Sequence, residues 1–260
     1  MTVSQVTLEK EPGAVNRPRH QWEKIKKPPT FCVILPVRNA QESLAKRVTA
    51  VTKVLENIQA RTTIIVVNDG SSDQTSTVLE QLSMVFPYLI VIERAESKGF
   101  GSANRAGFRA AIDHGFDYAL VLDGEIPADA ESIEHFLRPM LLSYDFIKAS
   151  RFSPYSQLEG VSVFSRCLSA LCNKLAGFVL ALPITDYSSG VRAIKCTLLA
   201  RMMTEEKGPA VLIEEVVQSK RLGAKFFEVP FTRMNAGDGS LYSSNPTAGD
   251  YGRCLKHLFG

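Results

Sequence analysis

Long apolar runs are missing from this 260-residue sequence. The longest candidate, from Leu175 to Ile184, contains Gly177 and Pro183, whereas a membrane-spanning helix needs about 20 apolar residues in succession. The N-terminus also lacks the apolar core of a secretory signal, so secretion is not indicated. We therefore expect a cytoplasmic protein that meets a membrane, if at all, from outside the bilayer.

Paired cysteines, clustered histidines and a strong net charge are missing as well. The five cysteines have no short paired spacing and the four histidines are scattered, which favours reduced, buried thiols over a zinc site. Six of the 30 Lys and Arg and three of the 27 Asp and Glu lie in residues 1–30, so the rest of the chain is neutral. This is not the composition of a nucleic-acid-binding protein.

The composition that is present, 45% hydrophobic and 22% charged residues, is enough to bury the core of one large domain. Residues 1–30 read as a basic, flexible leader. Such a leader either touches anionic lipid or is a solvated terminus.

Strands and helices alternate along the chain. Strands are expected at Phe31–Val37, Thr63–Val67, Leu89–Glu93, Tyr118–Leu122 and Phe146–Ser150, and helices at 42–58, 72–86, 102–114 and 129–142. This order predicts an α/β, Rossmann-like, mostly parallel sheet with helices on both faces. Ligands of such sheets bind beyond the carboxyl ends of the strands, so the loops at 36–41, 68–73, 94–101 and 123–128 should share one crevice.

Two carboxylates, Asp123 and Glu125, stand one residue apart where an apolar run ends. Acidic oxygens at that spacing can converge on Mg²⁺ or Mn²⁺ that also binds substrate phosphates. Solvated turn residues are the alternative interpretation.

Two further loops have the chemistry of a ligand site. In the loop at 68–73, Gly70 permits a tight turn and Ser72 or Asp73 can cap the next helix, which leaves Asp69 facing the crevice. A capped turn without a ligand explains the same residues. At Lys98–Asn104, two glycines allow close approach of a ligand to the backbone, although the pattern lacks the third glycine of an NAD site.

Residues 161–182 predict a helix with few charges, which either packs in the core or lies in a bilayer interface. The stretch from Gly239 is rich in Ser, Gly and Asn and is expected to form a flap over a bound ligand.

Seven motifs in a fixed order resemble the family 2 glycosyltransferases of the GT-A fold, most of all the dolichyl- or polyprenyl-phosphate mannosyl- and glucosyltransferases. They are Leu35–Glu42, Val67–Asp73, Gly99–Gly107, Leu122–Glu125, Ala149–Phe152, Asp186–Arg192 and Glu228–Phe231, followed by Arg233 and Ser240. The likeness covers about residues 31–243. It implies a single GT-A domain there, preceded by the leader at 1–30 and followed by a tail or short packing helix at 244–260.

The resemblance also implies the ligands. A nucleotide-sugar, GDP-mannose or UDP-glucose, would lie against Pro36, Arg38, Asn39, Glu42, Asp69, Lys98, Gly99, Asp123, Arg233 and Ser240. Asp123 and Glu125 would occupy the family's Asp-x-Asp positions and hold Mg²⁺ or Mn²⁺. The sequence departs from the family at Gly124, Glu125 and Pro127, which affects metal affinity and metal choice.

The acceptor side is expected to use arginines, because a lipid phosphate is already anionic and needs orientation and charge compensation more than a strong base. Arg151, Arg166 and Ser169 are the predicted lipid-phosphate contacts, and Arg151 and Arg192 join Asp123 and Glu125 as predicted catalytic residues. Glu214 and Glu215 either include a base for a hydroxyl acceptor, or are helix-surface charges, or brace an arginine.

The leading hypothesis is therefore an inverting, metal-dependent hexosyltransferase that uses a polyprenyl phosphate acceptor and is peripheral on the cytoplasmic face of a membrane. A GT-A transferase with a glycan, protein or small hydroxyl acceptor is one alternative. A non-catalytic relative that binds sugar nucleotides is the other.

Overall fold

The computed structural model describes residues 28–56, 58, 60–122, 130–150, 173–231 and 248–260. Its elements are β1 (Phe31–Val37), α1 (Leu44–Glu56), β2 (Thr62–Asp69), α2 (Thr75–Val85), β3 (Leu89–Arg94), α3 (Phe100–Asp113), β4 (Tyr118–Val121), α4 (Ala130–Leu141), β5 (Phe146–Ser150), β6 (Arg192–Lys195), α6 (Cys196–Leu199), α7 (Val211–Arg221), β7 (Phe226–Pro230) and α8 (Ala248–Phe259). Residues 173–180 are also helical.

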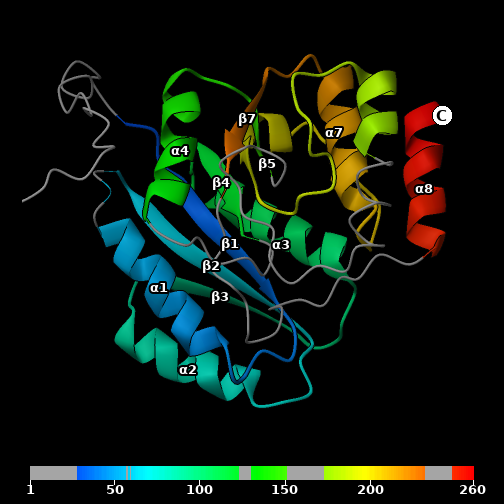
Figure 1. Ribbon diagram of the computed structural model, residues 1–260. Coiled ribbons are helices and arrows are strands. Elements are labelled where there is room, and N and C mark those ends of the chain that lie inside the picture. The colour runs from blue at the N-terminus through cyan, green and yellow to red at the C-terminus, as the bar shows by residue number, and fades with distance from the viewer. Residues whose placement is uncertain (1–27, 57, 59, 123–129, 151–172, 232–247) are drawn as a thin grey trace, which may run out of the picture.

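Within the described residues, seven strands form one sheet in the order β3-β2-β1-β4-β6-β5-β7 (Figure 1). The strands β3, β2, β1 and β4 are parallel neighbours, and β5 is parallel to β7. The short strand β6 runs antiparallel between β4 and β5. The predicted α/β architecture, a mostly parallel sheet, is therefore confirmed.

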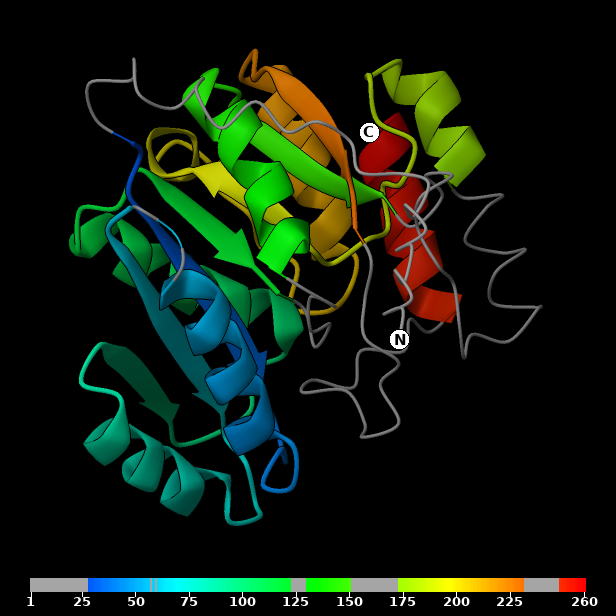
Figure 2. The same ribbon diagram turned by 60° about the vertical axis from the view of Figure 1, so that its left-hand side comes forward.

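Helices cover both faces of the sheet, because each strand alternates its buried side chains between two apolar clusters. Val33, Leu35 and Leu120 pack with α1, α2 and α4 on one face. Ile34, Ala119 and Val121 pack with α3, α6 and α7 on the other. Figures 1 and 2 both place α8 on the outer side of α7, next to helix 173–180.

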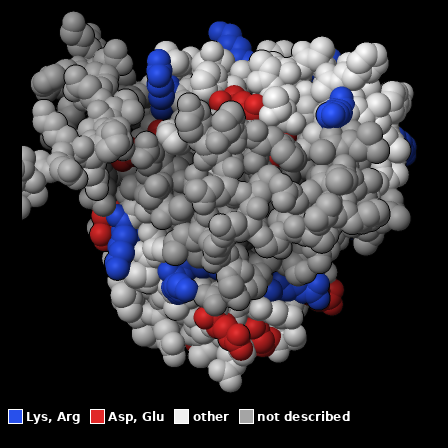
Figure 3. Space-filling view, in the orientation of Figure 1, with Lys and Arg blue, Asp and Glu red and all other residues white. Residues whose placement is uncertain are grey.

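The helix predicted at 161–182 is described only from residue 173 onward. Its described part contributes Ala176 and Leu180 to the cluster on the α3 and α7 face, while Phe178 is exposed. Among the described helices, none combines the length and apolar character that crossing a membrane would require. On the face seen in Figure 3, basic and acidic side chains are interspersed among the described residues.

Two of the five cysteines, Cys32 and Cys196, are buried thiols, and Cys254 is half-buried. Burial, with a smaller contribution from Asp117, raises the pKa of Cys196 to about 12. Burial, followed by the neighbouring Cys196, raises the pKa of Cys32 well above its usual range. Both groups stay protonated at neutral pH, so they act as packing residues and not as nucleophiles. Cys167 and Cys172 lie outside the described residues.

Candidate functional site

The carboxyl ends of β1, β2 and β3 lie along one edge of the sheet, because these strands are parallel and in adjacent positions. The loops after β1 and β2 are joined by hydrogen bonds. The Asn39 amide oxygen accepts a hydrogen bond from the backbone N–H of Ser72 (2.8 Å), and the Asn39 backbone N–H donates to Ser71 Oγ (2.9 Å). The predicted meeting of these loops is confirmed, and Asn39 is one of the residues that joins them.

A second set of contacts fixes the start of α2. Asp73 accepts hydrogen bonds from the backbone N–H of Thr75 (3.0 Å) and from that of Gln41 (3.2 Å). Burial alone would raise the pKa of Asp73, but these hydrogen bonds and that of the Thr75 hydroxyl lower it below its usual value. The N-cap position of α2 is Gln74, which makes no side-chain cap, and not Ser72 or Asp73 as the sequence predicted. Asp73, one residue earlier, still satisfies the free N–H of Thr75 in the first helical turn.

Other predicted donor contacts lie along the same edge. Pro36 is buried in β1, Arg38 is exposed just after it, and Glu42 is exposed just before α1. Lys98 is exposed in the loop between β3 and α3. These placements leave the three charged side chains accessible to an anionic or hydroxyl-bearing ligand.

The Asp69 carboxylate has partners within the protein. It accepts hydrogen bonds from Ser97 Oγ (2.8 Å) and from the backbone N–H groups of Lys98 (3.1 Å) and Gly99 (3.0 Å). It also forms an ion pair with Arg94 (2.8 Å) and is fully buried. The expectation that Asp69 is left facing a crevice is therefore wrong, because the next loop along the sheet edge surrounds it. Its contact with a nucleoside stays a prediction.

Gly99, just before α3, and Gly101, in its first turn, lie against backbone atoms of Glu206 and Lys207 and not against open space. A Cβ on Gly101 would lie 2.2 Å from the carbonyl oxygen of Glu206, and one on Gly99 would lie 2.5 Å from that of Lys207. The Gly101 N–H donates a hydrogen bond to the Lys207 carbonyl (2.8 Å). The sequence predicted close approach of a ligand, whereas the neighbour in the structure is the 203–208 loop (Met203–Gly208). Contact of Gly99 with a ligand stays a prediction.

Arg192 lies at the start of β6, beside the end of β4. Its Nε and Nη2 both donate to the Glu215 carboxylate on α7, the latter at 2.6 Å, and its Nη1 donates to the Gly190 carbonyl (2.6 Å). Both side chains are fully buried. The interpretation of Glu215 as a brace for an arginine is confirmed, whereas a helix-surface position is wrong. Direct contact of Arg192 with a phosphate stays a prediction.

Glu214, the neighbour of Glu215, is buried and holds a loop. Its two carboxylate oxygens accept hydrogen bonds from the backbone N–H groups of Glu205 (2.9 Å) and Glu206 (2.9 Å). A helix-surface position is wrong here too, because the 203–208 loop covers the side chain. Both candidate bases are thus occupied by structural partners.

The motif at 185–192 is organised by two carboxylates. Glu228 on β7 accepts hydrogen bonds from the backbone N–H groups of Thr185 (2.8 Å) and Asp186 (3.0 Å). Asp186, which is fully buried, accepts hydrogen bonds from the backbone N–H groups of Ser188 (3.2 Å) and Ser189 (3.0 Å). The chain that leads into Arg192 is therefore held by Glu228 from the neighbouring strand and by Asp186 from within the segment itself.

Lys148 is a buried charged residue beside Arg192 that the sequence motifs did not include. It is fully buried in β5, in register with Arg192 on β6 and with Glu228 on β7. Residues in register point to the same face of a sheet, so three charged side chains form a row next to the end of β4. The signal was present, since a lysine inside the apolar run of residues 146–149 is unusual for a buried strand.

The predicted metal ligands Asp123 and Glu125 lie outside the described residues, as do Arg151, Arg166, Ser169, Arg233 and Ser240 and the stretch from Gly239 to residue 247. Within the described ranges, no group of three or more His, Cys, Asp or Glu side chains is arranged to hold a metal ion. The roles of all these residues stay predictions.

The sequence model of the family described as "Glycosyl transferase family 2" matches residues 32–202 of this chain. This chain belongs to the family 2 glycosyltransferases. It is therefore an enzyme of glycosyl transfer, and the resemblance drawn from its seven motifs is confirmed.

Among the relatives of this family 2 glycosyltransferase is the polyprenol monophosphomannose synthase of Mycolicibacterium smegmatis, 26% identical over 219 residues, or 82% of this chain and 81% of the relative. The undecaprenyl-phosphate mannosyltransferase of Micrococcus luteus is 24% identical over 84% of this chain and 88% of its own. The dolichol-phosphate mannosyltransferase of Pyrococcus furiosus is 26% identical over 87% of this chain but only 62% of its own length.

Solved structures confirm the GT-A fold. A glucosyl-3-phosphoglycerate synthase from Mycobacterium tuberculosis, in complex with Mn²⁺, UDP and phosphoglyceric acid, superimposes with a TM-score of 0.60 at 16% identity. The match covers 89% of this chain and 79% of that one. A second structure of that synthase, with Mg²⁺ and UDP, gives a TM-score of 0.58 at 18% identity, with 88% and 76% covered. At this identity the likeness concerns the fold.

Proposed function

We propose that this glycosyltransferase moves a hexose, with inversion, from a nucleotide diphosphate to a polyprenyl phosphate at the cytoplasmic face of a membrane. The observation that carries the proposal is the engagement of both candidate bases, Glu214 with backbone N–H groups and Glu215 with Arg192. A hydroxyl acceptor needs a base to take its proton, whereas a phosphate oxygen is already anionic. The names of the three relatives, all enzymes of polyprenyl-phosphate mannosylation, support the same acceptor.

The donor in this proposal lies along the carboxyl edge of β1, β2 and β3. Arg38 and Lys98 are exposed there and carry the charge that a diphosphate would require. Asn39, Glu42, Gly99, Arg233 and Ser240 complete the proposed donor set, in which Asp69 acts by holding the backbone N–H groups of Lys98 and Gly99. The names of the relatives favour mannose, and UDP in the structural neighbours keeps UDP-glucose as the second candidate beside GDP-mannose.

Asp123 and Glu125 are the proposed ligands of Mg²⁺ or Mn²⁺. Carboxylate oxygens are the donors that these hard cations prefer, so the residue types fit the ion. A bound ion would offset the charge that develops on the departing diphosphate. The presence of Mn²⁺ or Mg²⁺ with UDP in the structural neighbours supports this assignment.

The acceptor phosphate is proposed to meet Arg151, Arg166 and Ser169, with Arg192 beside the end of β4. Their part is to hold the phosphate oxygen in line with the anomeric carbon and to balance the negative charge of two phosphorylated substrates. Contact with the membrane would be made by apolar side chains near helix 173–180 and α8, such as Phe178 and Phe259.

The test is a transfer assay with labelled GDP- and UDP-hexoses, a short polyprenyl phosphate and Mn²⁺. We expect wild-type protein to form a polyprenyl-phosphate hexose with the anomeric configuration inverted. Asp123→Asn should lose turnover, because it removes a charged ligand of the ion. Normal turnover by Asp123→Asn would refute the proposed site, and transfer only to a hydroxyl acceptor would refute the proposed acceptor.

Removing the ion offers an independent arm of this test. EDTA should abolish transfer and should also abolish any rise in melting temperature caused by the donor, since a bound ligand stabilises a protein by mass action. Adding back Mn²⁺ or Mg²⁺ should restore both. A donor-induced rise in melting temperature that EDTA does not change would contradict the metal assignment even if transfer were observed.

A further inference from the structure

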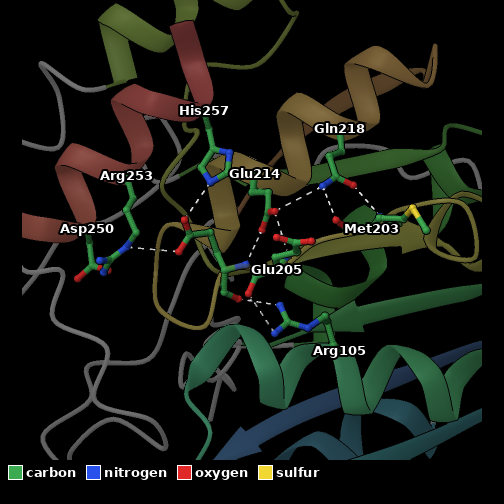
Figure 4. A network of polar contacts seen from close by, with 9 residues as sticks. Arg105, Met203, Glu205, Glu214, Gln218, Asp250, Arg253 and His257 are labelled. Atoms are coloured by element: carbon green, nitrogen blue, oxygen red, sulfur yellow. Dashed lines mark hydrogen bonds and ion pairs between the residues drawn. The ribbon is translucent and has the colours of Figure 1, made fainter. Parts of the chain in front are cut away.

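The 203–208 loop is the point where three helices meet. Figure 4 shows side chains from α3, α7 and α8 converging on it. Within this loop Glu206 contacts all three helices, α8 with its side chain and the other two with its backbone.

The contacts with α8 are made by the Glu206 carboxylate. One oxygen lies 3.0 Å from His257 Nε2, and the other lies 3.3 Å from Arg253 Nε. The Glu206 side chain is 17% exposed, so this small network is partly shielded from solvent. Arg253 is in turn paired with Asp250 on the same helix. A network of several charges holds its geometry better than a single surface ion pair.

The contacts with α7 and α3 are made by the Glu206 backbone. Its N–H donates to the Glu214 carboxylate (2.9 Å), and its carbonyl accepts from Arg105 Nη1 on α3 (2.7 Å). The carbonyl also lies where a Cβ on Gly101 would be. The loop is therefore fixed against the N-terminal turns of α3.

From there the contacts continue to the proposed donor loop. The Lys207 carbonyl accepts a hydrogen bond from Gly101 N–H, and the Lys207 backbone packs against Gly99. The Gly99 and Lys98 N–H groups then donate to Asp69 at the end of β2. An unbroken series of hydrogen bonds and packed backbone thus joins α8 to the loop at 94–99.

We propose that Glu206 is a positioning residue for donor binding: by holding α8 to the 203–208 loop, it keeps the start of α3 and the loop at 94–99 in their binding conformation. Glu206 does not touch the donor in this proposal. The inference rests on the proposed function, because it assigns the donor to Lys98 and Gly99, whose backbone N–H groups Asp69 holds. It explains why helix α8, outside the sheet layers, is tied to this loop by the contacts of Glu206 with Arg253 and His257.

The experiment compares Glu206→Ala with Glu205→Ala. Glu205 is the matched control, because its side chain is exposed and its described contacts are all made by its backbone. Glu206→Ala should raise the KM for the nucleotide-sugar by about three- to tenfold, in the range of couplings carried by packed networks, with kcat nearly unchanged. Glu205→Ala should leave both constants unchanged.

Hydrogen exchange distinguishes a residue that positions the donor loop from one that only stabilises α8, because only the former changes exchange rates in residues 97–101. Glu206→Ala should speed amide exchange in residues 97–101 as well as in α8, because the Gly101 N–H donates to Lys207 in the loop, and Gly99, whose N–H donates to Asp69, packs against the Lys207 backbone. Glu206→Gln, which keeps a hydrogen-bond acceptor for His257 but loses the charge, should give an intermediate KM. Faster exchange confined to α8, with an unchanged donor KM, would overturn the proposal.

A second variant covers the case in which Glu206→Ala does not fold. Arg253→Ala combined with His257→Ala removes the same contacts from the α8 side and should raise the donor KM in the same way. An unchanged KM in this double variant would overturn the proposal. Failure of the proposed function is distinguishable, because wild-type protein would then transfer no hexose, whereas failure of this inference leaves wild-type transfer intact and all variants equal to it.

Discussion

The Glu215 carboxylate on α7 accepts hydrogen bonds from two nitrogens of the Arg192 guanidinium on β6, and both side chains are fully buried. A guanidinium has five N–H donors, and the contacts with Glu215 and the Gly190 carbonyl use three of them. The pair lies beside the end of β4, where the predicted metal motif begins. Arg192 is therefore held in a fixed orientation at the edge of the proposed site.

Glu215→Ala is expected to destabilise the protein by about 3–5 kcal/mol, because it leaves a buried guanidinium without its counterion. Urea unfolding followed by circular dichroism measures this. The control is Asp113→Ala, which breaks the exposed pair with Arg109 and should cost less than about 1 kcal/mol. Equal effects of the two substitutions would contradict the importance assigned to burial.

Joint replacement of the pair, Arg192→Met with Glu215→Leu, should recover most of that stability, since apolar residues of similar size often replace a buried ion pair at little cost. If the folded double variant retained full hexosyl transfer, Arg192 would have no direct part in catalysis. The same assay thus separates the bracing role from the phosphate-binding role.

Gly101→Ala is expected to destabilise the protein by about 1–3 kcal/mol, although alanine is normally the better helix former. The reason is that the new Cβ would lie 2.2 Å from the Glu206 carbonyl oxygen. Gly252→Ala in α8 is the matched control, because its Cβ would have no heavy atom within 4 Å, and it should be neutral or stabilising. Thermal melts of both variants make the comparison. An unchanged stability of Gly101→Ala would show that the 203–208 loop can move away from the new Cβ at little cost in free energy.

Asp73 should make the stability of the protein depend on acid pH. Burial alone would raise its pKa, yet the hydrogen bonds from Thr75 and Gln41 lower it, so folding favours the charged carboxylate. The contribution is fully present above the ordinary value of 3.8 and is lost as the pH falls through the lower pKa of the folded state. Urea unfolding from neutral pH to pH values below 3.8 should show a smaller loss for Asp73→Asn than for wild-type protein. A parallel decline would contradict this assignment.

Phe178 is expected to contribute to membrane binding. It is 89% exposed on helix 173–180, which lies beside α8, where Phe259 is 67% exposed. Phe178→Ser should weaken sedimentation with vesicles that contain anionic lipid, because an exposed aromatic side chain gains free energy in the bilayer interface. Met84→Ser is the control, since Met84 on α2 is 85% exposed and lies on the other side of the sheet. Equal binding of the two variants would rule out this contact.

Local signals in the sequence predicted much of the fold. Alternating apolar runs and helical spacing located β1 to β5 and α1 to α4 within a few residues, because burial on a sheet and burial on one helix face leave different periods. For the chain after residue 185, the sequence offered only the alternatives of a tail or a short packing helix at 244–260, where α8 lies, and it did not predict β6, α6, α7 or β7. The strand β6 has four residues and pairs with β4 and β5, which are far away in the sequence, so no local period identifies it.

The same division applies to the candidate site. Asp69 and Gly99 were selected as ligand contacts, because an acid at a strand end and a glycine before a helix are local signals. In the structure both are surrounded by other parts of the protein. Their partners were not predictable. Asp69 meets residues 94–99, and Gly99 meets Lys207, which is more than 100 positions away.

The sequence by itself determined the family and the alternation of strands and helices, and it selected the loops proposed to bind the donor, since these inferences depend on residue types and short spacings. Only the tertiary structure decided that Glu215 holds Arg192, that Glu214 holds the 203–208 loop, and that Lys148 lies between Arg192 and Glu228. The physical reason is that a buried charge must find its counterpart across the fold, and that pairing is set by strand order and helix packing, not by neighbours in the chain.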